Sequence, residues 1–566
     1  MHLLREMALP FALREVASLV ALCAGAFLVA LREKALPFAL RAGALPLALR
    51  AAASLLVFTA AVRAETTLTV AMTAGDIPIT TGIPDQGSEG VRFVGYSLYD
   101  ALVLFDLSHS DTASNIRPGL ATSWKIDEQD SKRWLFTLRD GVRWHDGCPF
   151  TPEDVVWNFK RILDKNSPQF DPLQFALGRT YAGNVLSVEK VDDHTVAINM
   201  DRVHSLFPYL LPQIMLISPC NAEKLKYDRD ALMSHPSGTG PYRIQKLVAH
   251  ERLELLRNDD YWDKGRIPKH DRLVLIPMPE ASTRAAALLS GQVNFIEAPD
   301  PDAIPRLKSA GMNVITNTYP HNWAYQLNFV NGPFTDIRVR RAANYAINRP
   351  DVVELLGGTA IAGYSTAPPG MPYYGNPIKY EYDPGKATAL LKQAGCYPCK
   401  VNFAISTSGS GQMHPLPMNE LVKSQMDAVG FQVTLTSMDW NALLNISRGG
   451  VDKFPEYAGV NISRNLVDPF NGLVRHVWTG QWAPAGGNWG HFSSPETEAQ
   501  ITAIFNEFDD AKRMTLLTRL HETMNEQAVM VWVAHDLNPR ALSPKLKGFV
   551  QAQSWFQDLT PIVVSQ

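Results

Sequence analysis

The chain has 566 residues, of which 46% are hydrophobic and 19% charged, and its formal net charge at pH 7 is −3. This composition is typical of globular proteins, and the length predicts roughly three or four domain-sized units. The sequence has no basic run or tail of the kind that binds nucleic acid or an anionic membrane surface, so we exclude both partner classes.

The first 64 residues form an Ala/Leu-rich segment that differs from the rest of the chain. The sequence at 4–14 returns at 31–41 with one change. So few copies cannot build a solenoid, and we interpret the repeat as a duplicated or over-extended secretion leader. Residues 49–64 combine a positive flank, a short apolar run and a small-residue end, as signal peptides do, which predicts cleavage before Glu65. Residues 1–64 carry seven Lys or Arg and three Glu, so the mature chain has a net charge of about −7.

Four segments predict the secondary structure at the start of the mature chain. Residues 66–75 alternate as a strand does, and 96–106 has the apolar face of a helix. Residues 134–144 predict a hairpin, because Asp140-Gly141 is a turn sequence between two apolar stretches. Residues 151–163 predict a helix with a capping residue, a proline at its first position and two acidic residues in its first turn.

The stretch 137–150 places Asp140, His145, Asp146 and Cys148 within a few positions of one another. Such a set resembles a metal site or a nucleophile with its base. Each polar residue also has a structural role, because Asp140 belongs to the hairpin turn and His145-Asp146-Gly147 to a second turn before the capped helix. We therefore interpret the stretch as two turns and predict no catalysis there.

Four cysteines follow the predicted leader, and export would place them in an oxidising compartment. Cys396 and Cys399 form a C-x-x-C motif. A redox motif would precede a helix, whereas this one follows the helix-like segment 385–395, so we predict a small structural disulfide. A zinc site would need a second ligand pair at suitable spacing. The sequence leaves open whether Cys148 is free or paired with Cys220.

The later segments alternate between strand and helix patterns, with Gly, Pro or Asp at their boundaries. In chain order they are a turn and strand at 238–247, a pairing strand in 252–262, a helix that stops at Gly291 and a strand in 279–298, a strand at 325–329, helices capped by Asp336 in 333–356, and a β-α-β unit formed by 401–407, 418–430 and 431–440. This order predicts an α/β fold with mixed sheets.

Several of these segments together resemble one family, the peptide/nickel class of periplasmic solute-binding proteins that deliver ligands to ABC importers. The resemblance covers essentially all of 65–566, and its segments stand in family order. They are "RPGLATSWKID" (117–127), "WLFTLRDGVRWHDGCPFTPEDVVW" (134–157), "GTGPYRI" (238–244), "RNDDYW" (257–262), "LLSGQVNF" (288–295), "PFTDIRVRRAANYAINR" (333–349) and "GKATALLKQAG" (385–395).

The resemblance implies a two-lobed periplasmic-binding-protein clamp with an extra small domain inserted in lobe one. A ligand would be buried between the lobes, with hinge crossings near 319–323 and 531–535. The expected division is a cleaved leader at 1–64, lobe one at 65–100, 213–320 and 533–566, the inserted domain at 101–212, and lobe two at 321–532.

Peptide-binding members of the family carry an Asp in a D-Y-x-x-P pattern, and that carboxylate pairs with the free amine of the peptide. In "NISRNLVDPF" (461–470) the corresponding position is Asn465, with Arg464 beside it. An amide in place of the carboxylate favours a ligand without an α-amine, such as an opine-like compound, a sugar-phosphate conjugate or an acidic metabolite. The alternative is that the amine is bound elsewhere, for instance by Glu89. Arg464 would bind a carboxylate or phosphate bidentately.

Position in the family fold adds further ligand-binding candidates, each weighed against simple packing. Trp323 and Tyr325 flank the first hinge crossing, and Trp440 matches an aromatic residue that lines the cleft. Trp489 lies in a Gly-rich loop of lobe two, and His414 lies in a loop that would face the cleft.

The competing function is a secreted hydrolase, and its motifs are missing from the sequence. Residues 408–411 lack the spacing of a nucleophile elbow, and 521–525 have Asn where H-E-x-x-H needs its second His. A nickel complex could use His414, His491 and His535, but no ligand spacing pairs them. We therefore predict a periplasmic, monomeric binding protein that uses no cofactor or metal, is not an enzyme, and works with the permease subunits of an importer.

Overall fold

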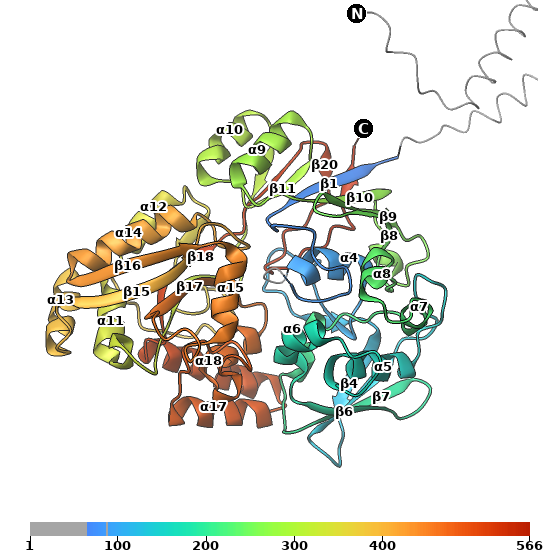
Figure 1. Ribbon diagram of the computed structural model, residues 1–566, viewed down its shortest axis with the longest axis horizontal. Coiled ribbons are helices and arrows are strands. Elements are labelled where there is room, and N and C mark those ends of the chain that lie inside the picture. Colours follow the sequence, from blue (N-terminus) through green and yellow to red (C-terminus); the bar gives the residue numbers. More distant parts are fainter. Residues whose placement is uncertain (1–64, 86–88, 566) are drawn as a thin grey trace, which may run out of the picture. The chain divides into compact units, whose positions relative to one another are not determined.

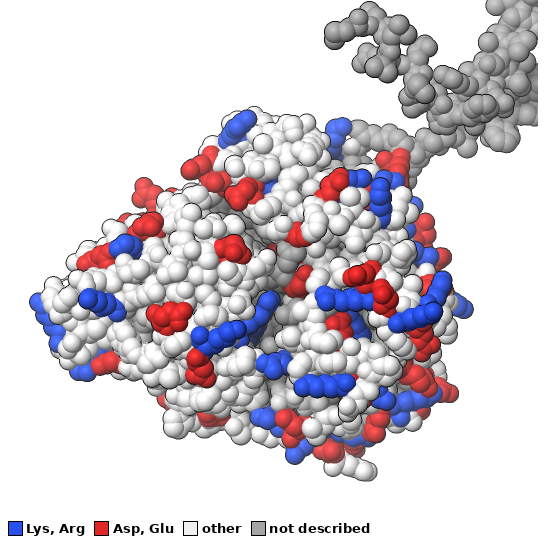
Figure 2. Space-filling model, in the orientation of Figure 1, with Lys and Arg blue, Asp and Glu red and all other residues white. Residues whose placement is uncertain are grey.

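The computed structural model describes residues 65–85 and 89–565. The predicted leader at 1–64 and its cleavage position lie outside the described residues. The unit Thr66–Gln566 is compact and is built around three main sheets (Figure 1). Within the described ranges, no helix is long and apolar enough to span a bilayer. On the face drawn in Figure 2, acidic and basic side chains are interspersed.

A seven-stranded sheet organises the part that we call lobe one, and it gathers strands from both ends of the chain. β1 (Thr67–Met72) runs parallel to both its neighbours, β10 (Arg272–Pro277) and β11 (Phe295–Glu297). Its alternation buries Leu68, Val70 and Met72 in one core and Ala71 in another. The strand order is β12 (Asn313–Ile315), β19 (Arg540–Leu542), β11, β1, β10, β9 (Arg252–Arg257) and β8 (Tyr242–Val248).

A four-stranded antiparallel sheet forms the inserted domain. Its order is β4 (Ala121–Ile126), β5 (Arg133–Leu138), β7 (Thr195–Met200) and β6 (Val185–Lys190). The hairpin predicted at 134–144 is wrong, because β5 pairs with β4 and β7 instead. Residues 142–150 form a separate tight loop, in which the Trp144 amide donates to the Cys148 carbonyl. The helix α5 (Pro152–Leu163) begins with a capping box at Thr151, as predicted.

The helix predicted over 96–106 is also wrong. The helix α4 (Tyr96–Leu98) is only three residues long, and β2 (Val103–Phe105) follows and pairs with β3 (Ile116–Pro118). These residues are buried on all sides, and a short buried apolar run does not distinguish helix from strand by its periodicity.

A six-stranded sheet organises lobe two. Its order is β14 (Ala360–Ala362), β18 (Met530–Asp536), β13 (His321–Leu327), β17 (Gly459–Asn465), β15 (Cys399–Ser406) and β16 (Phe431–Met438). The predicted β-α-β unit is confirmed, because β15 and β16 are parallel and α14 (Pro415–Ala428) connects them. Helices α11 (Ile337–Ala346) and α14 cover one face of the sheet, and α15 (Trp440–Gly449) covers the other (Figure 1).

The remaining helices pack around these sheets (Figure 1). Gly291 ends α9 (Ala281–Ser290) with a φ of +77°, and the side chain of Asp336 accepts a hydrogen bond at the start of α11, as the sequence predicts. The other helices are α6 (Pro172–Ala182), α7 (Pro219–Lys224), α8 (Arg229–Ser234), α10 (Ile304–Ser309), α12 (Arg349–Leu355), α13 (Pro384–Gln393), α16 (Arg475–Val477), α17 (Pro495–Asn506) and α18 (Asp510–Glu526).

The chain passes between the two large sheets just before β13 and just after β18. The predicted end of lobe two at residue 532 falls inside β18, which continues to Asp536 because it keeps pairing with β13 and β14. The inserted domain also contacts lobe two. Ser205 donates through its hydroxyl to the Ile504 carbonyl at 2.7 Å, and Phe207 shares a core with Phe505 of α17.

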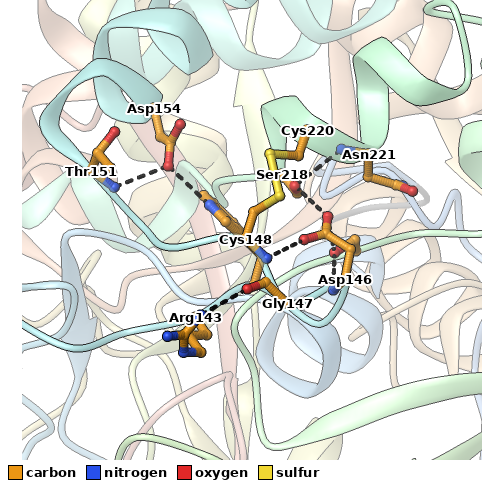
Figure 3. Close-up of a disulfide and its surroundings, with 11 residues drawn as sticks. Arg143, Asp146, Gly147, Cys148, Thr151, Asp154, Ser218, Cys220 and Asn221 are labelled. Carbon is orange, nitrogen blue, oxygen red and sulfur yellow. Dashed lines mark hydrogen bonds between the residues drawn. A yellow bond between two sulfur atoms is a disulfide. The ribbon is translucent and has the colours of Figure 1, made fainter.

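The cluster of reactive residue types at 145–148 is structural (Figure 3). Cys148 is disulfide-bonded to Cys220 in α7, and a second disulfide joins Cys396 to Cys399. The Asp146 carboxylate accepts hydrogen bonds from the Cys148 amide and from the hydroxyls of Ser218 and Ser237. These contacts hold the loop onto lobe one and leave no nucleophile or metal site in it.

The two disulfides should differ in their effect on stability. Cys148 and Cys220 are 72 positions apart, whereas Cys396 and Cys399 are three apart. The chain-entropy model gives about 4 kcal/mol for the first loop and about 2 kcal/mol for the second. We expect Cys148→Ala/Cys220→Ala to lower the urea midpoint more than Cys396→Ala/Cys399→Ala. Equal midpoints for the two double variants would contradict the expectation.

Candidate functional site

The candidate site is a cavity of about 500 Å³ between lobe two and the facing side of lobe one with its insert. Lobe two contributes α15, the end of β17 and the loop around Gly486. The other side contributes α6, Pro84 and Trp555. Ligand sites in proteins enclose roughly 300 to 1,000 Å³, so this volume suits a small molecule. Closure of two lobes around such a space buries the ligand.

Four arginines line the cavity: Arg179 from α6, Arg448 from α15, Arg464 from β17 and Arg475 from α16. Its lining includes no Asp or Glu. Within the described part of the chain, none of the four forms an ion pair with a carboxylate within 4.0 Å. In Figure 2, Lys and Arg side chains lie on both sides of the seam between the α15 side and the α6 side. The cavity is therefore electropositive.

Arg464 is the central cation of this set. Its guanidinium donates to two neutral acceptors, Gln326 Oε1 at 3.1 Å and Ser447 Oγ at 2.7 Å. Its Nε has no partner among the described residues, and the same is true of Arg475 Nε. Burial, followed by repulsion from Arg475 and Arg448, lowers the pKa of Arg464 to about 9. The nearest charges thus disfavour the cation instead of neutralising it.

Aromatic rings close the end of the cavity near the hinge. The rings of His321 and Trp555 stack with centroids 5.0 Å apart and an interplanar angle of 5°, and Tyr319 stacks on His321. The guanidinium of Arg92 lies 4.0 Å from the Trp555 centroid. Burial lowers the pKa of His321 to about 3, so this imidazole is neutral at pH 7. The end wall offers flat ring surfaces, and two of its ring nitrogens, His321 Nδ1 and Trp555 Nε1, have no hydrogen-bond partner among the described residues.

Three of the residues predicted from the sequence line the cavity: Trp440, Arg464 and Asn465. Asn465 is the last residue of β17 and is half-buried. The nearby Asp468 does not line the cavity, because its carboxylate accepts from the amide and the side chain of Asn471. At the position where the family resemblance expects a carboxylate, the cavity presents an amide.

Three other predicted residues are core residues and do not line the cavity. Trp323 and Tyr325 are 0% exposed and lie on β13 beneath α11 and α14. Trp489 is 1% exposed, packs against α15 and donates to the Ile446 carbonyl. The prediction for these three residues failed because it rested on their positions along the chain, near segments that form the cleft. In the structure, β13 and the Gly-rich loop direct the three rings into the cores of lobe two.

Glu89 also lies outside the cavity lining, although it is close to it. Its carboxylate is fully buried and accepts from Thr73 Oγ1, Arg92 Nη2 and Ser410 Oγ. Ser410 belongs to lobe two and lines the cavity. Since internal donors occupy the Glu89 oxygens, the structure gives this residue a contact between the lobes and not a free carboxylate for an amine.

His414 lies at the start of α14, half-buried, with Nδ1 3.9 Å from an Asp300 oxygen. The histidines considered for nickel have separate surroundings: His491 stacks on Trp482, and His535 bonds to the His321 carbonyl. In the parts of the chain that the structure describes, no group of three or more His, Cys, Asp or Glu residues is placed to hold a metal ion.

Sequence reasoning missed Arg179, Arg448, Arg475, His321 and Trp555. Each lies in a segment whose local pattern indicates only a helix, a strand or a loop. Trp555 lies more than 200 positions from the ring on which it stacks. No signal in a single sequence brings these residues together.

The family model described as "Bacterial extracellular solute-binding proteins, family 5 Middle" matches residues 115–473. Heme-binding protein A of Haemophilus influenzae is 29% identical to the chain over 477 residues, which cover 80% of this chain and 84% of the relative.

Two solved structures share the fold. One is an ABC transporter-associated periplasmic binding protein from Helicobacter pylori in complex with the peptide STSA, with a TM-score of 0.76, 24% identity, and coverage of 89% of this chain and 99% of that one. The other is a binding protein from A. tumefaciens R10 in complex with mannopinic acid, with a TM-score of 0.72, 23% identity, and coverage of 89% and 100%. They confirm the predicted α/β clamp.

The unneutralised position of Arg464 should destabilise the protein when no ligand is bound. We expect Arg464→Met to raise the melting temperature by a few degrees, because Met replaces the aliphatic stem of the side chain and removes the repulsion from Arg475. Since the pKa of Arg464 is lowered in the folded state, this penalty is complete at pH 7 and is relieved only as the pH rises above about 9.

Arg349→Met is the matched control. Arg349 is also buried, but it donates to the carbonyls of Gly363, Tyr380 and Trp532. Its loss removes these buried hydrogen bonds and should lower the melting temperature. A fall in the melting temperature of Arg464→Met as large as that of Arg349→Met would show that Arg464 is a structural residue.

Proposed function

Because the chain belongs to the bacterial extracellular solute-binding proteins of family 5, we propose that it captures a peptide or peptide-like small molecule between its two lobes and delivers it to an ABC importer. The observation that carries this proposal is the cavity of about 500 Å³ that both lobes line. Such a site removes the solute from water and reports its presence by closure.

Contacts across the cleft support a clamp that is closed in this structure. Ser410 of lobe two donates to Glu89 of lobe one. Arg475 of lobe two lies close enough to Tyr181 of the insert to affect the pKa of that phenol, which burial raises. A ligand that touches both walls would add to these contacts and favour the closed form, since a ligand shifts an equilibrium only by its differential affinity for the two states.

The rest of the biological role follows from the family and from the predicted leader. We place the mature protein in the periplasm after removal of residues 1–64, as a monomer that docks on the permease subunits of its importer. The protein has a binding role and no catalytic one. Asp146 and Cys148, which belong to the stretch that resembles a reactive cluster in the sequence, have structural partners.

A non-peptide ligand in the same cavity is the second candidate. The relative and the two solved structures are named for heme, for a peptide and for mannopinic acid, so similar chains take chemically different ligands. Asn465 and the absence of Asp and Glu from the cavity lining favour a solute without a free amine, such as an opine or a sugar-phosphate conjugate. A nickel complex has no comparable support among the described residues.

A ligand screen tests the capture function. The melting temperature of the purified protein should rise with one class among dipeptides, opines, sugar phosphates and Ni²⁺-histidine. At about 100 times the dissociation constant, the folded state gains about 2.7 kcal/mol. In small-angle scattering, the same ligand should reduce the radius of gyration if the free protein is open. If the free protein is already closed, the radius of gyration should stay the same. No response to any class, together with turnover of ester or peptide substrates, would contradict a binding role.

A further inference from the structure

The three arginines of lobe two, Arg448, Arg464 and Arg475, form a cation cluster that protein groups do not neutralise. They come from separate elements, α15, β17 and α16, and all three line the cavity. The positive charges of Arg448 and Arg475 both act on Arg464. A guanidinium that is half-buried without a carboxylate is costly, so its retention calls for a partner that the protein itself does not supply.

Buried arginines elsewhere in the described chain show the usual solutions. Arg540 pairs with Glu297 at 3.2 Å and Arg266 with Asp558 at 2.7 Å, while Arg284 donates to four backbone carbonyls. Arg464 has only the neutral oxygens of Gln326 and Ser447, and Arg475 donates to Asn471 Oδ1 at 3.3 Å and lies beside the Tyr181 phenol. Arg464 and Arg475 are half-buried and Arg448 is exposed, yet none of the three has a carboxylate partner among the described residues, and all three face the cavity.

The acidic residues nearest to the cluster do not neutralise it. Asp468 accepts two hydrogen bonds from Asn471, and among the described residues it forms no ion pair with Arg475. Asp85 of lobe one accepts from the Ile79 amide and is buried. Burial raises the pKa of Asp468 to about 6 and that of Asp85 to about 7, so at pH 7 Asp468 is largely ionised and Asp85 only partly, and within the described ranges neither forms an ion pair with an arginine of the cluster. Since no carboxylate of the described residues pairs with Arg448, Arg464 or Arg475, we infer that their counter-ion is an anionic group on the ligand.

The facing wall suits the rest of such a ligand. Arg179 and Tyr181 of α6 line the same cavity and approach it from the insert, so an anion bound to lobe two can also be contacted from the opposite side. Trp440 packs over Gly409, where a Cβ atom would lie 2.5 Å from the indole. With Trp555 it provides flat surfaces for a sugar ring or another uncharged body.

We propose that Arg448, Arg464 and Arg475 bind a doubly charged oxyanion at one end of the captured solute, supplied by a phosphate monoester or a dicarboxylate. The proposal rests on the proposed capture function and names the ligand class for the same cavity. Guanidinium groups bind carboxylate and phosphate oxygens in bidentate pairs, and a double negative charge matches a cluster of three cations better than a single carboxylate does.

The test is isothermal titration of the full mature protein with five probes: glucose 1-phosphate, inorganic phosphate, succinate, glucose and Ala-Ala. We expect one or more of the doubly charged probes to bind and the neutral sugar to bind far more weakly. Binding of the sugar phosphate and inorganic phosphate without succinate identifies a phosphate site, and the reverse identifies a dicarboxylate site. The affinity should fall as the salt concentration rises, because the binding groups are charged.

Four variants locate the site. Arg464→Met and Arg475→Met should each weaken anion binding by about 10- to 100-fold, the range for loss of charge-assisted hydrogen bonds. Arg464→Lys should bind the anion more tightly than Arg464→Met but less tightly than the unmodified protein. Lysine keeps the positive charge but lacks the planar guanidinium that forms two parallel hydrogen bonds to an oxyanion. Arg519→Met removes an exposed arginine of α18 that pairs with Glu526 and does not line the cavity, so it should leave binding unchanged. Circular dichroism confirms that each variant is folded.

The two proposals fail in different ways. Tight binding of Ala-Ala that Arg464→Met and Arg475→Met leave unchanged would overturn the anion site while capture stands. If all four variants bind the anion as tightly as the unmodified protein does, the anion site is also overturned, because the anion would then bind elsewhere. No binding of any probe, together with no response to the wider ligand screen, would overturn the capture function and the anion site with it.

Discussion

Two carboxylates and two guanidinium groups lie buried together where the lobes meet. Glu297 of β11 pairs with Arg540 of β19 and with Arg92, and Arg92 also pairs with Glu89. All four side chains are nearly inaccessible to solvent. The group links Glu89 and Arg92 near the start of the mature chain to the paired strands β11 and β19, and it receives the Ser410 hydroxyl from lobe two. Because removal of one member of a buried pair leaves an uncompensated charge, this network constrains the base of the cleft.

The cavity wall above this network has the opposite electrostatic character. At the base of the cleft every charge has a partner, whereas Arg448, Arg464 and Arg475 have none within ion-pair distance among the described residues. Both arrangements use arginine, but they serve different ends. The neutral network stabilises the junction between the lobes, whereas the arginines of the unneutralised cluster remain available to form ion pairs with a solute. A protein keeps local instability of this kind where it has a function.

Much of the architecture could be predicted from the sequence, and the failures have physical causes. The capped helix at 151–163, the helix stop at Gly291 and the β-α-β unit at 401–440 follow local rules of capping, glycine conformation and periodicity. The helix expected at 96–106 and the hairpin at 134–144 failed because long-range strand pairing decided them. Of the eight ligand residues predicted, Trp440, Arg464 and Asn465 line the cavity, while Trp323, Tyr325 and Trp489 pack in cores.

The sequence by itself determined the family and the α/β class, because these depend on residue identity and order along the chain. Only the tertiary structure decided that Arg464 meets Arg448 and Arg475, that Trp555 stacks on His321, and that Glu89 is already satisfied by Thr73, Arg92 and Ser410. The physical reason is that charge and hydrogen-bond satisfaction are properties of neighbours in space. The sequence does not show whether the neighbour of an arginine in space is a carboxylate or an open cavity.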